Sequence, residues 1–170
     1  FTVTTSEEPA MPLTLTIRPY TPVDLPEMVK LFQETVRRVC SKDYTSVQLE
    51  AWVGKVDLAR WEKTLAEHTT LLAFDGEALV GFGDIRRDGY LDRLYVRWDR
   101  QGQGVGTALC DRLEAAGNFS RVFTEASITA RPFFDHRGYQ VIQAQQVVRH
   151  GIVLQNYVME KNIKVFSEKG

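Results

Sequence analysis

The spacing of apolar residues divides the first part of the chain into one strand and three helices. Residues 13–17 alternate apolar and polar side chains, which is the period of a strand with one buried face. Apolar residues then recur at helical spacing over residues 24–40, and shorter helices are expected over 46–53 and 57–65. The first and third of these helices begin with Asp, a residue that caps helix N-termini.

From about residue 70 the pattern changes to short strands separated by turns. Asp75–Gly76 and Asp88–Gly89 are strong hairpin signals, so they predict an antiparallel meander. The elements expected in this region are strands over 70–74, 78–86 and 90–97, a helix over 104–116, a strand over 121–125, a short helix over 130–136, and a final hairpin of strands 139–148 and 152–160. This order predicts an α+β (mixed α/β) domain around one sheet of six or seven strands.

The two ends of the chain lack this periodicity. Residues 1–10 are polar and aperiodic, and we expect an extension or a cloning remnant outside the fold. Residues 11–162 carry the predicted elements and are expected to form a single domain. Residues 163–170 are expected to be a loose tail.

Composition excludes several classes of protein. With 21 basic and 22 acidic residues, the net charge of −1 gives no general electrostatic reason to bind nucleic acid. No apolar run is long enough for a transmembrane helix, so no membrane partner is expected. Cys40 and Cys110 cannot make a disulfide framework, and His68, His136 and His150 lack the spacing of metal ligands. These features favour a reduced, cytoplasmic location and no metal.

A glycine-rich loop carries the most informative chemistry. Gly102, Gly104 and Gly106 lie between an expected strand and an expected helix. Glycines let main-chain N–H groups converge there, and the helix N-terminus adds partial positive charge, so the loop is suited to a phosphate or pyrophosphate. A Walker loop needs a Lys where Val105 stands, and a dinucleotide loop needs a different glycine spacing. A turn that binds nothing is the alternative.

Two motifs together resemble a known family. Gln101-x-x-Gly104-x-Gly106 resembles the acyl-CoA pyrophosphate loop of the GNAT superfamily of N-acetyltransferases, and the preceding LDRLYVRWD is similar to its central strand. ARPFFDHRGYQV resembles the later helix-plus-strand motif of the same superfamily, which ends in Gly-Phe or Gly-Tyr. The resemblance covers about residues 13–161.

The resemblance implies acetyl-CoA as the cosubstrate and names the residues that would hold it. In the superfamily the central strand is bulged and splays from its neighbour, and pantetheine lies in the gap like an added strand. The implied main-chain contacts are Leu94, Tyr95 and Val96 for pantetheine, and Gln101, Gly102, Gln103, Gly104, Val105, Gly106 and Thr107 for pyrophosphate. Arg97, Arg100 or Arg131 would reach the 3′-phosphate.

Transfer to an amine also needs a base that removes a proton from the ammonium form. Asp92 is one candidate, and alternation places it on the strand face that carries Leu94 and Val96. Glu125 ends the next strand, where some members of the superfamily place a base, and Asp84 is a third choice. A structural ion pair or helix cap is the alternative role for each carboxylate.

The general acid and the acceptor site are less well defined. Phe134 stands where the superfamily often has a Tyr that protonates the leaving sulfur, so either the thiolate leaves unassisted or Tyr139, Tyr157 or Ser127 substitutes. Residues that we expect to line the acceptor site are Tyr44, Trp52 and Tyr157, with Trp61 beside them and Asp43 and Glu50 as attractors of a cationic amine.

The resemblance therefore implies an acetyl-CoA-dependent N-acetyltransferase. The acetyl group would pass to a primary amine of a small molecule or peptide by direct attack in a ternary complex. An acyl-enzyme at Cys40 or Cys110 is a second route. A non-catalytic acyl-CoA-binding sensor or assembly module is the rival function, favoured by Phe134. A homodimer is left open.

Overall fold

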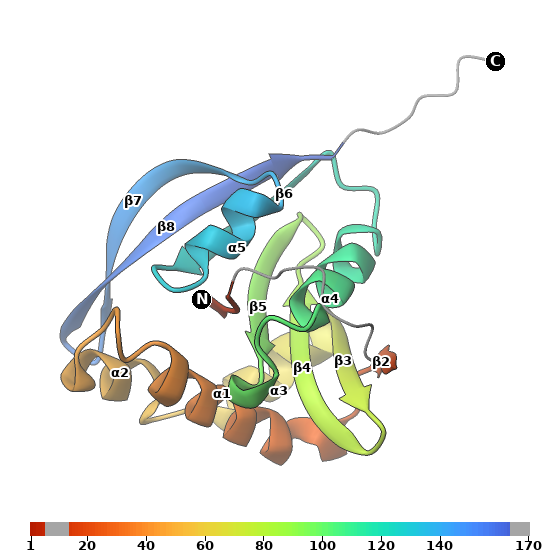
Figure 1. The fold of residues 1–170 in the computed structure, drawn as a ribbon, viewed down its shortest axis with the longest axis horizontal. Helices are drawn as coiled ribbons and strands as arrows, with labels where there is room; N and C mark the ends of the chain where they lie inside the picture. The colour runs from red at the N-terminus through yellow and green to blue at the C-terminus, as the bar shows by residue number, and fades with distance from the viewer. Residues whose placement is uncertain (6–13, 164–170) are drawn as a thin grey trace.

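The computed structural model describes residues 1–5 and 14–163, which form one mixed sheet with helices on both faces (Figure 1). The strands are β1 Thr2–Val3, β2 Leu15–Pro19, β3 Thr69–Asp75, β4 Ala78–Ile85, β5 Tyr90–Val96, β6 Arg121–Ser127, β7 Gln140–Arg149 and β8 Ile152–Asn162. The helices are α1 Leu25–Val39, α2 Ser46–Val53, α3 Leu58–Glu67, α4 Val105–Glu114 and α5 Arg131–His136, with 3-10 turns at Pro22–Asp24 and Trp98–Arg100. The expected α+β class is confirmed; the expectations for residues 6–13 and 164–170 lie outside the described residues.

The sheet runs in the order β2-β3-β4-β5-β1-β6-β8-β7. Its pairings are antiparallel except around β1, where β1–β5, β1–β6 and β5–β6 are parallel. No helix in the described part of the chain is long and apolar enough to cross a membrane.

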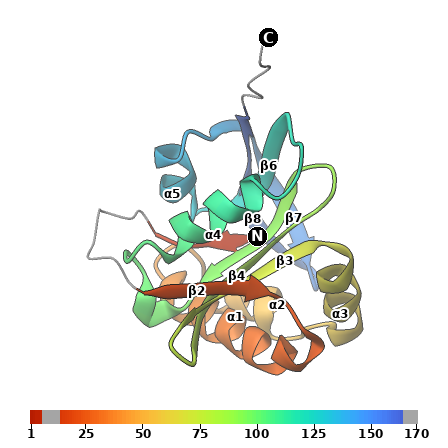
Figure 2. The same ribbon diagram turned by 90° about the vertical axis from the view of Figure 1, so that its right-hand side faces the viewer.

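Helices α1, α2 and α3 cover one face of the sheet, and α4 and α5 cover the other (Figure 2). On the first face, Met28 and Phe32 of α1 pack with Phe82 and Tyr95 of the sheet. On the second face, α4 lies close to β4 because two strand positions are glycine. A Cβ atom at Gly81 would stand 2.8 Å from a side-chain carbon of Val105.

Strands β5 and β6 pair directly at one end and then separate. Their direct pairs are Tyr90 with Phe123 and Leu91 with Thr124. Beyond these pairs β1 lies between them, with Thr2 opposite both Leu94 and Ala126. The splayed central strand that the resemblance implied is therefore present, and the gap holds the chain's own first residues.

The expectation that residues 1–10 lie outside the fold is wrong for residues 2–4. Thr2, Val3 and Thr4 are fully buried. A strand of two residues is too short to show periodicity, and its neighbours on the sheet are far away in sequence. This strand also makes the sheet eight-stranded rather than six- or seven-stranded.

A bulge in β5 changes the face on which Asp92 lies. Arg93 pairs with Asp84 and Leu91 pairs with Ile85, so Asp92 has no partner on β4. Simple alternation would place Asp92 with Leu94 on the α4 side, and this prediction is wrong. Such a bulge inserts one residue and re-aims the side chains around it. Here it brings Asp92 to the α1–α3 side, next to Arg93.

Candidate active site

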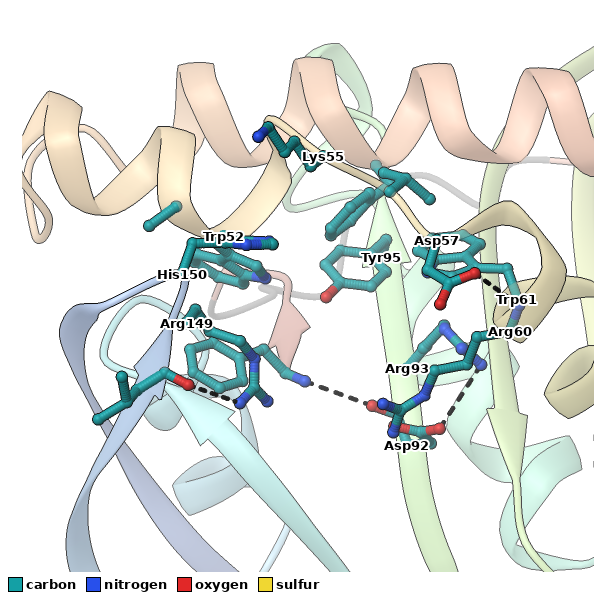
Figure 3. A pocket seen from close by; sticks show the side chains of 15 residues that line it. Trp52, Lys55, Asp57, Arg60, Trp61, Asp92, Arg93, Tyr95, Arg149 and His150 are labelled. Carbon is teal, nitrogen blue, oxygen red and sulfur yellow. Dashed lines mark hydrogen bonds and ion pairs between the residues drawn. The ribbon is translucent and has the colours of Figure 1, made fainter.

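Two adjoining cavities lie where β5, the α2–α3 connection and the tip of the β7–β8 hairpin meet, and Figure 3 shows the first of them. The first, which we call the aromatic cavity, measures about 430 Å³ and is lined by Trp52, Trp61 and Tyr95. The second, the carboxylate cavity, measures about 390 Å³ and is lined by Asp92 and Glu125. The residues that line both are Phe1, Arg60, Asp92 and Arg149.

A buried network of charges lies beside these cavities. Arg93 Nη1 donates to Asp84 Oδ2 at 2.8 Å and lies 3.5 Å from Asp92 Oδ2. His68 Nδ1 lies 2.7 Å from the same Asp84 oxygen. Burial raises the pKa of the Asp84 carboxyl, and the Arg93 charge opposes that shift. Asp84 is thus held by two partners inside the protein, which favours a structural role over that of a base.

The structure brings two of the predicted bases together. Asp92 and Glu125 both line the carboxylate cavity, although they come from different strands. The side-chain amide of Asn156 donates to Glu125 Oε2 at 3.4 Å, so Glu125 is weakly restrained. His68 lines the same cavity and was not among the predicted site residues. Sequence spacing could not find it, because its partner Asp84 lies on another element.

The gap between β5 and β6 has the form of a slot for an extended molecule. Its walls are the edges of two parallel strands that do not pair with each other at this level. The hydroxyl of Ser127 is aimed into it and donates to the carbonyl oxygen of Thr2 at 2.6 Å. Such edges offer main-chain N–H and C=O groups to any chain of amides.

The glycine loop lies at the end of β5 and opens directly into α4. Gly102 and Gly104 have φ angles of +71° and +86°, and a Cβ atom at either would meet nothing within 4 Å. The loop is therefore open at these two positions, and it ends at the N-terminus of a ten-residue helix. The Gln101 side chain ties the loop to the strand by donating to the Val96 carbonyl at 2.6 Å. Gln103 lies between the two glycines, and its side-chain oxygen is buried without a hydrogen-bond partner among the described residues.

The arginines suggested for the 3′-phosphate all have acidic neighbours. The ion pairs are Arg97–Asp99 at 2.6 Å, Arg100–Asp75 at 3.1 Å and Arg131–Asp135 at 3.5 Å. Each is at least partly exposed, so solvent screens the pair and the arginine can exchange partners. The structure therefore does not single out one of them.

The residues suggested as a general acid lie mostly elsewhere. Phe134 is fully buried and packs edge-on against Phe133 and Tyr139. The Tyr139 hydroxyl donates to Glu114 at 2.7 Å, and burial raises its pKa. Tyr139 thus belongs to the core under α4 and α5, and the structure does not bring it to Asp92.

The predicted acceptor residues are not brought together either. Trp52 lines the aromatic cavity, as expected. Tyr44 is buried, and its hydroxyl donates to the Gln155 carbonyl and accepts from the Ile128 amide. Tyr157 packs on the opposite face of β8, against the core under α4 and α5, with Arg131 over its ring. Only Trp52 of the three lines either cavity.

The two acidic residues expected to attract a cation are occupied. Asp43 accepts from the Thr129 hydroxyl at 2.6 Å, and Glu50 pairs with Arg37 at 2.9 Å. The aromatic cavity is instead rich in cationic side chains. Its basic lining residues are Lys55, Arg60, Arg93, Arg149 and His150, and its acidic ones are Asp57 and Asp92.

Both cysteines are buried. Burial raises the pKa of the Cys40 thiol to about 12, and Cys110, which belongs to α4, lies in the core. A thiol must be ionised and accessible to act as a nucleophile. The structure gives neither cysteine these properties.

Comparisons of the sequence with known proteins find acetyltransferases. The sequence model described as "Acetyltransferase (GNAT) domain" matches residues 40–161. The chain is 33% identical over 143 residues to the uncharacterized N-acetyltransferase YafP of Escherichia coli (strain K12), covering 84% of this chain and 93% of that protein.

Solved structures with a similar fold are also N-acetyltransferases. A GCN5-related N-acetyltransferase from Rhodopseudomonas palustris superposes with a TM-score of 0.86 at 32% identity, over 90% of this chain and 98% of that one. The PaiA N-acetyltransferase from Thermoplasma acidophilum, solved in complex with coenzyme A, superposes with a TM-score of 0.71 at 16% identity, over 88% and 99%.

Proposed function

Since the chain belongs to the GNAT family of acetyltransferases, we propose that it transfers an acetyl group from acetyl-CoA to a primary amine of a small molecule or peptide. The observation that carries this proposal is the order of three features along β5, which we call the donor path: the glycine loop after its end, the gap between β5 and β6, and the carboxylate cavity beside Asp92. Each part of the path suits one part of an acyl-CoA molecule.

Residues of this chain fit the donor along the whole path. The loop from Gln101 to Thr107 and the α4 N-terminus would hold the pyrophosphate. Main-chain groups of Leu94, Tyr95 and Val96 would pair with the pantetheine amides, and the Ser127 hydroxyl adds a donor from β6. Bound acetyl-CoA would supply an activated thioester carbonyl at the end of the slot.

Asp92 and Glu125 are the proposed bases. A base must lie where the amine approaches the thioester, and both carboxylates line the cavity at the end of the slot. Arg93 Nη1 lies 3.5 Å from Asp92 Oδ2 and restrains this carboxylate from one side. Direct attack by the amine in a ternary complex fits better than a cysteine intermediate, because both thiols are buried.

The lining of the aromatic cavity narrows the acceptor class. Lys55, Arg60 and Arg149 approach it from separate segments, and none forms an ion pair with a carboxylate within residues 1–5 and 14–163. Uncompensated cations around a cavity favour an anionic ligand. The acceptor would therefore carry a carboxylate or another anionic group besides its amine. Of the three residues proposed from the sequence for the acceptor site, we retain Trp52, which lines the aromatic cavity. Tyr44 packs against the ring of Trp52, and Tyr157 lies on the opposite face of β8.

A matched pair of acceptors tests this class. γ-Aminobutyrate and its neutral amide carry a primary amine on the same carbon chain and differ in one charge. The acid is expected to have the higher kcat/KM, and Arg60→Ala is expected to raise its KM about tenfold, the effect of one lost charged hydrogen bond. Arg87→Ala, on an exposed turn, is the control. Equal kcat/KM for acid and amide would contradict the anionic class.

The rival proposal is an acyl-CoA-binding sensor or assembly module without catalysis. Phe134 favours it, because no hydroxyl stands at that position to protonate the leaving sulfur. Binding of acetyl-CoA without release of free CoA for any amine would support this rival. A cytoplasmic location and a homodimer stay predictions from the sequence.

A further inference from the structure

The first five residues run along the whole donor path. The main-chain nitrogen of Phe1 donates to the Asp92 carbonyl at 3.4 Å, beside the carboxylate cavity. Thr2 and Val3 form β1 between β5 and β6. The amide of Thr5 donates to the side chain of Gln101 at 2.8 Å, on the glycine loop. One segment thus touches the cavity, the slot and the loop in order.

Pairing of this segment uses the groups that we assign to the donor. Thr2 and Val3 lie opposite Leu94 and Tyr95, and the Ser127 hydroxyl bonds to the Thr2 carbonyl. A strand edge has one set of main-chain groups and cannot pair with two extended chains at the same level. Residues 2–3 and the pantetheine arm therefore exclude each other.

The acceptor side is blocked by the same segment. The ring of Phe1 lies 4.6 Å from the ring of Trp52, and Phe1 lines both cavities. With the segment in place, the aromatic cavity is partly filled and its wall at Trp52 is covered.

The segment is buried but imperfectly matched to its site. Val3 packs in the core under α1 and α2, which stabilises the bound strand. The hydroxyls of Thr2 and Thr4, however, are buried with no hydrogen-bond partner among the described residues. A buried polar group without a partner costs free energy, and such groups are rare in permanent cores. The two unpaired hydroxyls therefore favour a strand that can leave the slot over one that occupies it permanently.

We propose that residues 1–5 are an autoinhibitory strand that occupies the donor slot and leaves when acetyl-CoA binds. The inference rests on the proposed function and adds regulation to the same site. The apparent affinity for acetyl-CoA is then the affinity of the open slot multiplied by the fraction of molecules in which the strand is out. Weakening the strand raises that fraction.

Val3→Asp in the full chain is the first test. A carboxylate at this position would be buried in an apolar core, so the strand is disfavoured in the slot. Calorimetric titration with acetyl-CoA is expected to give a Kd at least about tenfold lower than that of the wild type. Val23→Asp, which adds the same charge at an 84% exposed position, is expected to leave Kd unchanged.

The second test is a disulfide that holds β1 in the slot and can be reduced again. Thr2 and Ala126 are opposite each other in the β1–β6 pairing, so Thr2→Cys with Ala126→Cys places two thiols at a distance that a disulfide can span. The oxidised form is expected to lose acetyl-CoA binding, and the reduced form to regain it. The double variant also reports on the strand if Val3→Asp fails to fold.

The outcomes separate the two proposals. An unchanged Kd in a folded Val3→Asp protein, or tight binding by the oxidised double variant, would overturn the autoinhibitory strand while leaving the proposed function intact. Absence of acetyl-CoA binding in the wild type, in Val3→Asp and in the reduced double variant would overturn the proposed function itself.

Discussion

Arg93 donates a hydrogen bond to the carboxylate of Asp84 at 2.8 Å, and both side chains are buried beneath the candidate active site. Arg93 also donates to the Thr64 hydroxyl at 2.9 Å and lies over the ring of Trp61. This pair therefore joins β4 and β5 to α3 at the wall of the aromatic cavity. Its loss should affect folding as well as the site.

Removal of the Arg93 charge should destabilise the protein strongly. Arg93→Met leaves Asp84 buried without its main cationic partner, and breaking a buried pair in this way typically costs about 3–5 kcal/mol. The measurement is the free energy of unfolding in denaturant. Arg121→Met, which breaks the half-exposed pair with Glu160, is the control and should cost about 1 kcal/mol or less. Equal effects of the two substitutions would show that the Asp84 pair is not buried as described.

The proposed bases can be separated by neutral isosteres. Asp92→Asn or Glu125→Gln, whichever removes the base, should lower kcat about 10²- to 10⁴-fold at neutral pH. The KM for acetyl-CoA should change little, because neither side chain belongs to the proposed donor slot. Asp88→Asn, in an exposed turn, serves as the control. If both variants keep the wild-type kcat, neither carboxylate is the base.

The glycine loop can be tested at one position. Gly104→Glu places a carboxylate on the open surface where the pyrophosphate would bind, so acetyl-CoA binding should be lost, as judged by thermal shift with excess acetyl-CoA. Gly76→Glu is a matched control, because Gly76 also has a positive φ and no atom within 4 Å of an added Cβ. An unchanged thermal shift in Gly104→Glu would contradict the proposed pyrophosphate site.

Stability should depend on pH through the carboxyl at the start of α1. Arg18 pairs with Asp24 at 2.7 Å and lowers the pKa of that carboxyl to about 2, below its unfolded value of 3.8. The stabilisation is therefore present above about pH 4 and is lost as the pH falls towards 2. Arg18 is 40% exposed, so solvent screens the pair and the contribution to stability is smaller than the pKa shift alone would give.

Unfolding curves between pH 2 and 6 provide the measurement for this pair. Asp24→Asn keeps the size of the side chain and removes its charge. The wild type should exceed this variant in stability at pH 6 and match it near pH 2. A difference that stays constant over the whole range would contradict a role for the ionised carboxylate.

Local signals in the sequence predicted most of the fold. Helical and strand periods gave the order of elements from residue 15 to residue 162, and the Asp-Gly turns and Asp caps gave several boundaries. The glycine loop is also a local feature and was predicted from its glycine spacing, since Gly102 and Gly104 provide the left-handed backbone that the loop requires. Such features depend on neighbours in sequence, and periodicity reports those neighbours directly.

Features that depend on distant contacts were missed. The bulge that turns Asp92 away from the Leu94 face arises from the register between β4 and β5, which alternation within one strand does not reveal. The pairing of His68 with Asp84 joins two elements, and the insertion of Thr2 joins residues more than ninety positions apart. Each of these three features therefore depends on a contact between separate elements, which the local propensities of the residues do not report.

Release of free CoA tests the central claim most directly. Wild-type protein is mixed with acetyl-CoA and a panel of primary amines, with and without a carboxylate, and the thiol of CoA is detected as it forms. At least one anionic amine is expected to give multiple turnovers per protein molecule, with the acetylated amine formed in equal amount. Release of CoA without acetylated amine, or no release with any amine, would contradict N-acetyl transfer as the function.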